Sequence, residues 1–116
     1  MGEEARGTTR PIAGTHFYVL LALADEPRYG LGIAEEVSER TGGEVRLGPG
    51  TLYNAVRKML EDRLIDEWTP PDDEEVDPRR RYYRITEEGR DALAAEAEHL
   101  ETLVAAAREK RAFRTA

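Results

Sequence analysis

The side chains best suited to chemistry lie in one stretch near the middle of the chain, LGPGTLYNAVRKMLEDRLI, from residue 47 to residue 65. An arginine can pair with the edge of a guanine through two hydrogen bonds, and an asparagine can pair with an adenine in the same way. Asn54, Arg57 and Lys58 could therefore read base edges. Thr51 and Tyr53 carry hydroxyl groups, which suit the phosphate contacts that position a protein on DNA. The residue types of this stretch are therefore compatible with a surface that contacts nucleic acid.

Helical spacing separates these polar side chains from an apolar face. Four apolar residues follow one another at steps of four, three and one, which places them on one side of a helix. They are Leu52, Val56, Met59 and Leu60. The opposite side comprises Gly50, Asn54, Arg57, Lys58 and Glu61. Because Gly50 has no side chain, the start of the helix could approach a phosphate closely. Alternatively, Arg57 and Lys58 are ordinary solvated residues, and Tyr53 is a core or interface aromatic.

A second basic stretch, PRRRYYR (residues 78–84), follows the acidic run DDEEVD. The segments LIDEW and RYYRI on either side of this charged, proline-containing loop predict a β-hairpin with a long tip. Its arginines could contact DNA or could instead neutralise the adjacent acids. They are Arg79, Arg80 and Arg81. Tyr82 and Tyr83 must point to opposite faces of a strand, so one of them is expected in the core. Trp68 is expected to pack rather than to bind a ligand.

The elements that would position these side chains alternate helices with short strands. Apolar helical patterns cover residues 14–24 and 31–41, and a third helix begins at Pro49, a residue suited to a first helical turn. The segment EVRL (residues 44–47) alternates polar and apolar residues, as a very short strand does. Thr86 is the expected N-cap of a final helix that runs to about Ala112. Three helices followed by a hairpin predict a winged helix-turn-helix.

The final helix carries a narrow apolar seam at alternating steps of four and three, a spacing typical of coiled coils. The seam comprises Leu93, Ala97, Leu100, Val104 and Ala107. A helix this long would leave the seam in water, so a second copy of the chain is its expected partner. The first helix is expected to add Phe17, Tyr18 and Leu21 to this dimer interface. Packing of the seam against its own domain is the alternative.

Composition limits the classes of protein to which the chain could belong. Its 116 residues suffice for one domain, and it contains no cysteine for disulfides, metal sites or catalysis. His16 and His99 have no second ligand at metal spacing, and Ser38 has no histidine beside it, so no metal, cofactor or enzymatic activity is expected. The net charge of -7 means that a local basic face must attract DNA. The sequence has no signal-peptide pattern and no membrane-spanning run, which predicts a cytoplasmic protein.

Four segments together resemble the PadR-like family of transcriptional regulators: VLLALADEPRYGLGI, GPGTLYNAVRKMLEDRLI, RRRYYRIT and TEEGRDAL. The resemblance implies a homodimeric winged-helix repressor, of a kind sometimes released from DNA by a small molecule. It implies that Tyr29, Thr51 and Tyr53 meet the DNA backbone and that the basic hairpin reaches a neighbouring groove. Three residues depart from the family's pattern. Leu31 replaces an aromatic residue, Gly48 replaces a capping serine, and Arg63 replaces a glycine.

These observations predict a mainly α-helical fold with a small β-hairpin, a winged helix-turn-helix followed by a long dimerisation helix. The expected divisions are an N-terminal arm (1–13), the winged-helix domain (14–86), the dimerisation helix (87–112) and a tail (113–116). The expected partners are double-stranded DNA with an inverted-repeat operator, a second copy of the chain and, from the resemblance, a small-molecule effector; no membrane is expected. The rival interpretation is a winged-helix module for protein–protein assembly, which the acidic tip PPDDEEVDP would suit.

Overall fold

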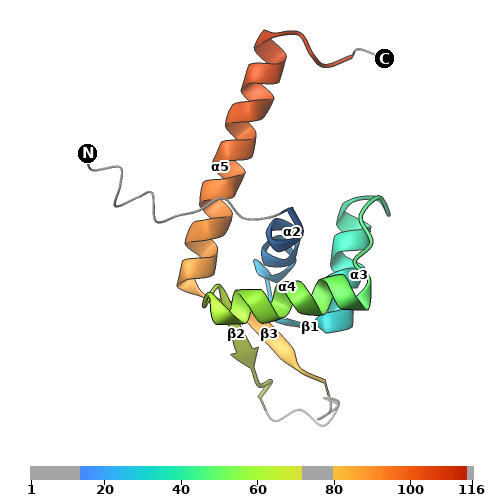
Figure 1. The fold of residues 1–116 in the computed structure, drawn as a ribbon, viewed down its shortest axis with the longest axis vertical. Helices are drawn as coiled ribbons and strands as arrows, with labels where there is room; N and C mark the ends of the chain where they lie inside the picture. Colours follow the sequence, from blue (N-terminus) through green and yellow to red (C-terminus); the bar gives the residue numbers. More distant parts are fainter. Residues whose placement is uncertain (1–13, 72–79, 115–116) are drawn as a thin grey trace, which may run out of the picture.

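A computed structural model describes residues 14–71 and 80–114 of the chain. Within these residues, four helices and three strands follow one another in the predicted order of helices and hairpin (Figure 1). In chain order they are α2 (Gly14–Leu23), β1 (Arg28–Tyr29), α3 (Gly30–Arg40), α4 (Pro49–Glu61), β2 (Ile65–Trp68), β3 (Tyr82–Ile85) and α5 (Glu87–Glu109). The mainly helical fold with one small antiparallel sheet confirms the predicted fold class.

The core forms where the three short helices meet the inner face of the sheet. α2, α3, α4 and β2 contribute Leu20, Ile33, Met59 and Ile65, each no more than 1% exposed. β3 adds Tyr83, which is 4% exposed, so it is the buried member of the tyrosine pair. Burying one such apolar side chain stabilises the fold by about 1.5–3 kcal/mol relative to leaving it in water. This core fixes the outer faces of α4 and of the hairpin in space.

The sheet has the order β1-β3-β2, and its third strand is not the predicted one. Residues 44–47 form no strand, so that prediction was wrong, and residues 28–29 pair with β3 instead. Val45 and Leu47 alternate with polar residues because both pack against the core from a connecting loop that belongs to no strand. The predicted hairpin is confirmed, since β2 and β3 pair in antiparallel register from Ile65–Ile85 to Trp68–Tyr82.

The base of α5 is fixed to the turn that follows α4. Thr86 caps α5 as predicted, because its side-chain oxygen accepts a hydrogen bond of 3.0 Å from the Gly89 amide. The same hydroxyl donates to the Arg63 carbonyl at 2.7 Å. A Cβ atom on Gly89 would collide with the Leu64 carbonyl oxygen. Arg63 has a φ of 61°, a left-handed conformation in which glycine would be unstrained.

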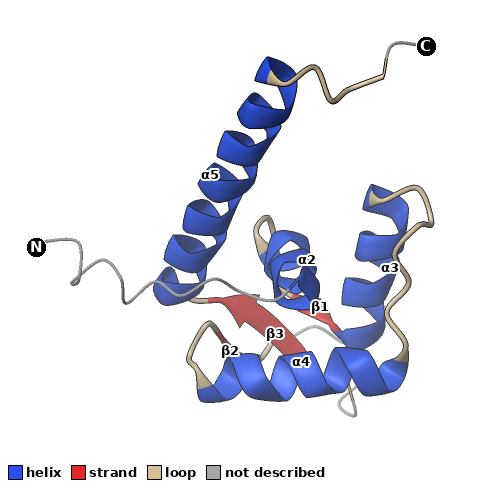
Figure 2. Cartoon of the chain, turned by 45° about the horizontal axis from the view of Figure 1, so that its top comes forward, coloured by secondary structure: helices blue, strands red, loops and turns tan. Residues whose placement is uncertain are grey.

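Beyond its base, α5 extends away from the rest of the domain (Figures 1 and 2). Gly89 and Ala92 are its buried residues, whereas Leu100, Leu103 and Val104 are 38%, 51% and 41% exposed. The helix ends at Glu109, three residues before the predicted end. The reason is a turn in which Arg111 has a φ of 55°, which is incompatible with further right-handed helix.

Candidate nucleic-acid interface

α4 presents a polar face to solvent on the side opposite its buried residues. Its first turn contains Pro49, and the preceding Gly48 is extended, with no side-chain cap hydrogen bond. The exposed residues of the predicted face are Gly50, Thr51, Tyr53, Asn54, Arg57, Lys58 and Glu61. The buried residues are Leu52, Ala55, Val56 and Met59, while Leu60 is only half-buried. The apolar face is therefore centred nearer Ala55 than the sequence pattern indicated.

The polar groups on this face are held by weak contacts with one another. Arg57 donates a hydrogen bond of 2.8 Å to the side-chain oxygen of Asn54. Lys58 forms an ion pair of 3.4 Å with Asp62, and the Lys58 side chain is 55% exposed. Exposed pairs of this kind contribute about 0–1 kcal/mol, so they can be exchanged for contacts with a ligand. Arg57 and Asn54 lie one turn apart and can face the same part of a groove.

The side chain of Tyr53 extends from α4 to the start of α3. Its side chain is 52% exposed, so within this chain it is a surface residue rather than a core aromatic. A Cβ atom on Gly30 would lie 2.6 Å from the Tyr53 hydroxyl, so this close approach requires glycine at position 30. Gly30 follows Tyr29, which occupies the N-cap position of α3 in extended conformation. The Tyr53 hydroxyl is thereby placed beside the first turn of α3.

The hairpin places Arg80 and Arg81 beside Tyr29 and Tyr53. The guanidinium carbon of Arg80 lies 4.3 Å from the centre of the Tyr29 ring, within the range of a cation–π interaction. Tyr29 in turn lies 5.5 Å from Tyr82, and Tyr82 lies 6.1 Å from Trp68, between ring centres. Trp68 packs within this aromatic row, as predicted. Arg81 is 71% exposed and pairs with Glu67 at 3.1 Å, which leaves its side chain at the surface.

These side chains surround one open hollow of about 420 Å³ beside α4. It is lined by Tyr29, Gly30, Leu31, Tyr53, Arg80, Arg81 and Tyr83. The structure thus brings together four of the predicted DNA-binding residues, from β1, α4 and the hairpin. Arg79, also predicted, lies outside the described residues. Gly30 was not predicted as a site residue, because only its packing against Tyr53 indicates its role.

The predicted dimer residues form an apolar surface on α2 and α5. Leu21 is 40% exposed, and Phe17 and Tyr18 are half-buried, with 6.4 Å between their ring centres. Leu93 packs partly against the domain's own core. Further along the seam, Ala97, Leu100 and Val104 are exposed, and Ala107 is half-buried. Most of the seam therefore remains open in the single chain, with Leu103 as an additional exposed apolar residue.

Burial shifts the pKa values of two described aromatic side chains, those of His16 and Tyr83. Burial lowers the pKa of His16, which lies on α2, and the nearby Asp62 carboxylate opposes this shift. His99 is exposed on α5. Burial also raises the pKa of the core residue Tyr83. In residues 14–71 and 80–114, no three metal-ligating side chains come together. In the described part of the chain, no helix combines the length and the apolar composition needed to cross a membrane.

A family model described as the transcriptional regulator PadR-like family matches residues 19–95. The chain belongs to this family. The match covers the hollow, the exposed face of α4 and the base of α5, so these lie within a DNA-binding winged helix. It also places the chain among transcriptional regulators. The family resemblance stated from the sequence is confirmed.

Solved structures show the same fold. The chain is 26% identical to a PadR family transcription regulator from Clostridium difficile, with a TM-score of 0.71 over 84% of this chain and 97% of that one. It is 28% identical to RosR from H. salinarum, with a TM-score of 0.59 over 90% and 99% of the two chains. Among protein sequences, it is 35% identical over 85 residues to a 37.1 kDa protein in transposon TN4556 of Streptomyces fradiae. The chain spans 22% of that relative's length.

Proposed function

We propose that this chain is a homodimeric repressor of transcription that binds a specific sequence in double-stranded DNA. In this proposal α4 enters the major groove, with Asn54, Arg57 and Lys58 directed at base edges. Gly50 and Thr51 approach the backbone at the start of the helix. Each well-placed pairing between a side chain and a base contributes about 1–3 kcal/mol of discrimination against the wrong base.

The observation that carries the proposal is the hollow beside this face. Two tyrosine rings and two arginines from three separate elements converge there, namely Tyr29, Tyr53, Arg80 and Arg81. Tyrosine hydroxyls and guanidinium groups donate hydrogen bonds but carry no negative charge, which suits a phosphate group of the DNA backbone. A phosphate seated in this hollow would fix α4 relative to the groove, because Tyr53 belongs to α4 itself.

The exposed seam of α5 supports a dimer. Leu100 and Val104 are 38% and 41% exposed in the single chain, and Leu21 on α2 is 40% exposed. Burying this surface against a second copy would give two α4 helices related by a two-fold axis. Such a dimer recognises an inverted repeat, whose half-sites lie about one or two helical turns apart.

The experiment that tests the proposal is fluorescence anisotropy with the chain's own upstream DNA and with a scrambled duplex of equal length. We expect tighter binding to the upstream DNA, and binding that weakens steeply with salt as condensed counterions are released. The Arg57→Ala variant should lose about 1–3 kcal/mol on the preferred sequence and discriminate less at one base pair. Uniform weakening on every sequence would instead make Arg57 a phosphate contact.

Arg40→Ala is the matched control, because it removes the same charge from an exposed site at the far end of α3. Within residues 14–71 and 80–114, the ion-pair partner of Arg40 is Glu36, at 2.8 Å. It should leave the preference for the upstream DNA unchanged. Absence of binding to either duplex at low salt, by a folded dimer, would favour the rival function of a winged-helix module for protein–protein assembly.

A further inference from the structure

Arg81, one of the arginines at the hollow beside α4, has a carboxylate partner within the chain. Its guanidinium group lies 3.1 and 3.3 Å from the two carboxylate oxygens of Glu67. The side chains of Arg81 and Glu67 are 71% and 54% exposed, so a ligand from solvent can reach the pair. A phosphate binds arginine through the same guanidinium N–H donors as a carboxylate does. Glu67 therefore holds a group that a phosphate of the DNA backbone would also contact.

The register of the hairpin places Glu67 on the inner face of the sheet. Glu67 lies directly opposite Tyr83, and residues paired in this way project from the same face. Tyr83 is 4% exposed and lines the hollow together with Tyr53 and Arg81. Burial raises the pKa of Tyr83, and the Glu67 carboxylate raises it further, which agrees with this placement. The negative charge of Glu67 thus lies next to the hollow.

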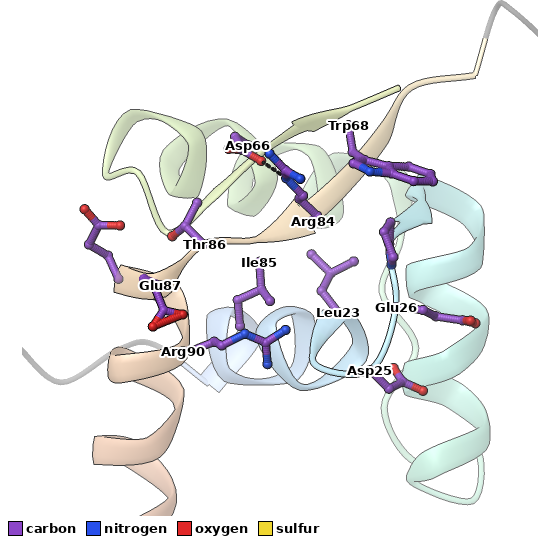
Figure 3. Close-up of a pocket in the computed structure, with 12 residues that line it drawn as sticks. Leu23, Asp25, Glu26, Asp66, Trp68, Arg84, Ile85, Thr86, Glu87 and Arg90 are labelled. Carbon is purple, nitrogen blue, oxygen red and sulfur yellow. Dashed lines mark hydrogen bonds and ion pairs between the residues drawn. The ribbon is translucent and has the colours of Figure 1, made fainter. Parts of the chain in front are cut away.

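A second ion pair of the hairpin lies on the opposite face of the sheet. Asp66 pairs with Arg84 at 3.0 Å, and their side chains are 50% and 55% exposed (Figure 3). Successive side chains of a strand project to opposite faces, so Asp66 and Glu67 point to different sides although they are neighbours in sequence. Asp66 and Arg84 accordingly line a different hollow from the one that Arg81 lines. The hairpin therefore offers two acids of equal charge and similar exposure, of which Glu67 contacts an arginine of the hollow beside α4.

We infer that Glu67 limits the affinity of the chain for DNA by competing with a backbone phosphate for Arg81. This role rests on the proposed function, in which a phosphate occupies the hollow. Binding exchanges the Glu67–Arg81 pair for a phosphate–Arg81 pair, and the released carboxylate remains close to the phosphate charge. Exchange of an exposed ion pair and repulsion between like charges a few ångströms apart in water each weaken binding by up to about fivefold. Because every nucleotide carries the same phosphate, Glu67 weakens binding to the operator and to other DNA alike.

The test is the affinity of full-length Glu67→Gln for the chain's upstream DNA and for the scrambled duplex, measured by fluorescence anisotropy at several salt concentrations. Glutamine retains the shape of the side chain and removes its charge. We expect the variant to bind both duplexes about threefold to tenfold more tightly than the parent protein. The slope of log affinity against log salt should become steeper by up to about 0.9, the contribution of one phosphate contact. Asp66→Asn is the matched control and should change either affinity by less than about twofold, because its charge lies on the other face and is screened by salt.

A double-mutant cycle with Arg81→Ala shows whether the effect passes through this arginine. In the Arg81→Ala background, Glu67→Gln should tighten binding by less than about twofold, because neither the guanidinium group nor the phosphate that it holds remains beside position 67. Unchanged or weaker binding by folded Glu67→Gln, an equal gain in Asp66→Asn, or an undiminished gain in the Arg81→Ala background would overturn the inference and leave the proposed function intact. Failure of the parent protein to bind either duplex at low salt would refute the proposed function and this role of Glu67 together.

Discussion

The close contact between Gly30 and Tyr53 gives a substitution that should separate DNA binding from stability. In Gly30→Ala, the new Cβ atom would lie 2.6 Å from the Tyr53 hydroxyl, whereas ordinary contact begins at 3.4 Å. The hydroxyl must therefore move by about 0.8 Å, the difference between these two distances. Tyr53 is half-exposed and can move at its far end, and alanine is favoured over glycine in a helix by about 1 kcal/mol. Stability should therefore change little.

The effect on DNA binding should be larger, because a hydrogen bond tolerates only a few tenths of an ångström of displacement. A hydrogen bond to a charged group contributes about 1.5–3 kcal/mol, so loss of a Tyr53–phosphate bond should weaken operator binding roughly 10- to 100-fold. The assay is fluorescence anisotropy, with thermal unfolding measured on the same samples.

A double-mutant cycle supplies the control. Tyr53→Phe removes only the hydroxyl and should weaken binding by a similar factor. Adding Tyr53→Phe to Gly30→Ala should cost little more, because the two substitutions remove the same contact. Full affinity in folded Gly30→Ala, or additive losses in the double variant, would refute the reasoning.

Three further substitutions test the fold and the dimer. Arg63→Gly should raise the free energy of unfolding by about 1 kcal/mol, since glycine relieves the left-handed backbone at that position; an unchanged denaturation midpoint would contradict this. Gly89→Ala should lower the free energy of unfolding by about 3 kcal/mol, because the new Cβ atom would collide with the backbone carbonyl of Leu64. A variant as stable as the parent in urea denaturation would show that the turn rearranges without cost. Leu100→Asp should weaken the dimer roughly 100-fold in sedimentation, whereas an unchanged dimer would remove the seam from the interface.

The helices and the hairpin could be predicted because their signals are local. Apolar residues three and four positions apart indicate helices whatever lies elsewhere in the chain, and Thr86 signals a helix start by its type and position. β1 could not be predicted, because two residues form a strand only where β3 offers an edge. The alternation at residues 44–47 was misleading because side chains that pack against a core from a loop also alternate.

The candidate site was predictable in its residue types but not in its assembly. Asn54, Arg57 and Lys58 follow from the period of one helix. The convergence of Tyr53 with Tyr29 and Arg80 depends on how three elements pack, and no spacing in the sequence encodes it. The need for glycine at position 30 becomes visible only in the structure, where the Tyr53 hydroxyl lies against the start of α3.

The most direct measurement of the central claim is methylation protection of guanine N7 in the major groove. The DNA would be a duplex that the protein itself selects from a random pool. We expect protected guanines in two half-sites related by a two-fold axis, and loss of protection at one position per half-site in Arg57→Ala but not in Arg40→Ala. Unprotected guanines throughout a bound duplex, or the same pattern in both variants, would contradict the account in which α4 reads the major groove through Arg57.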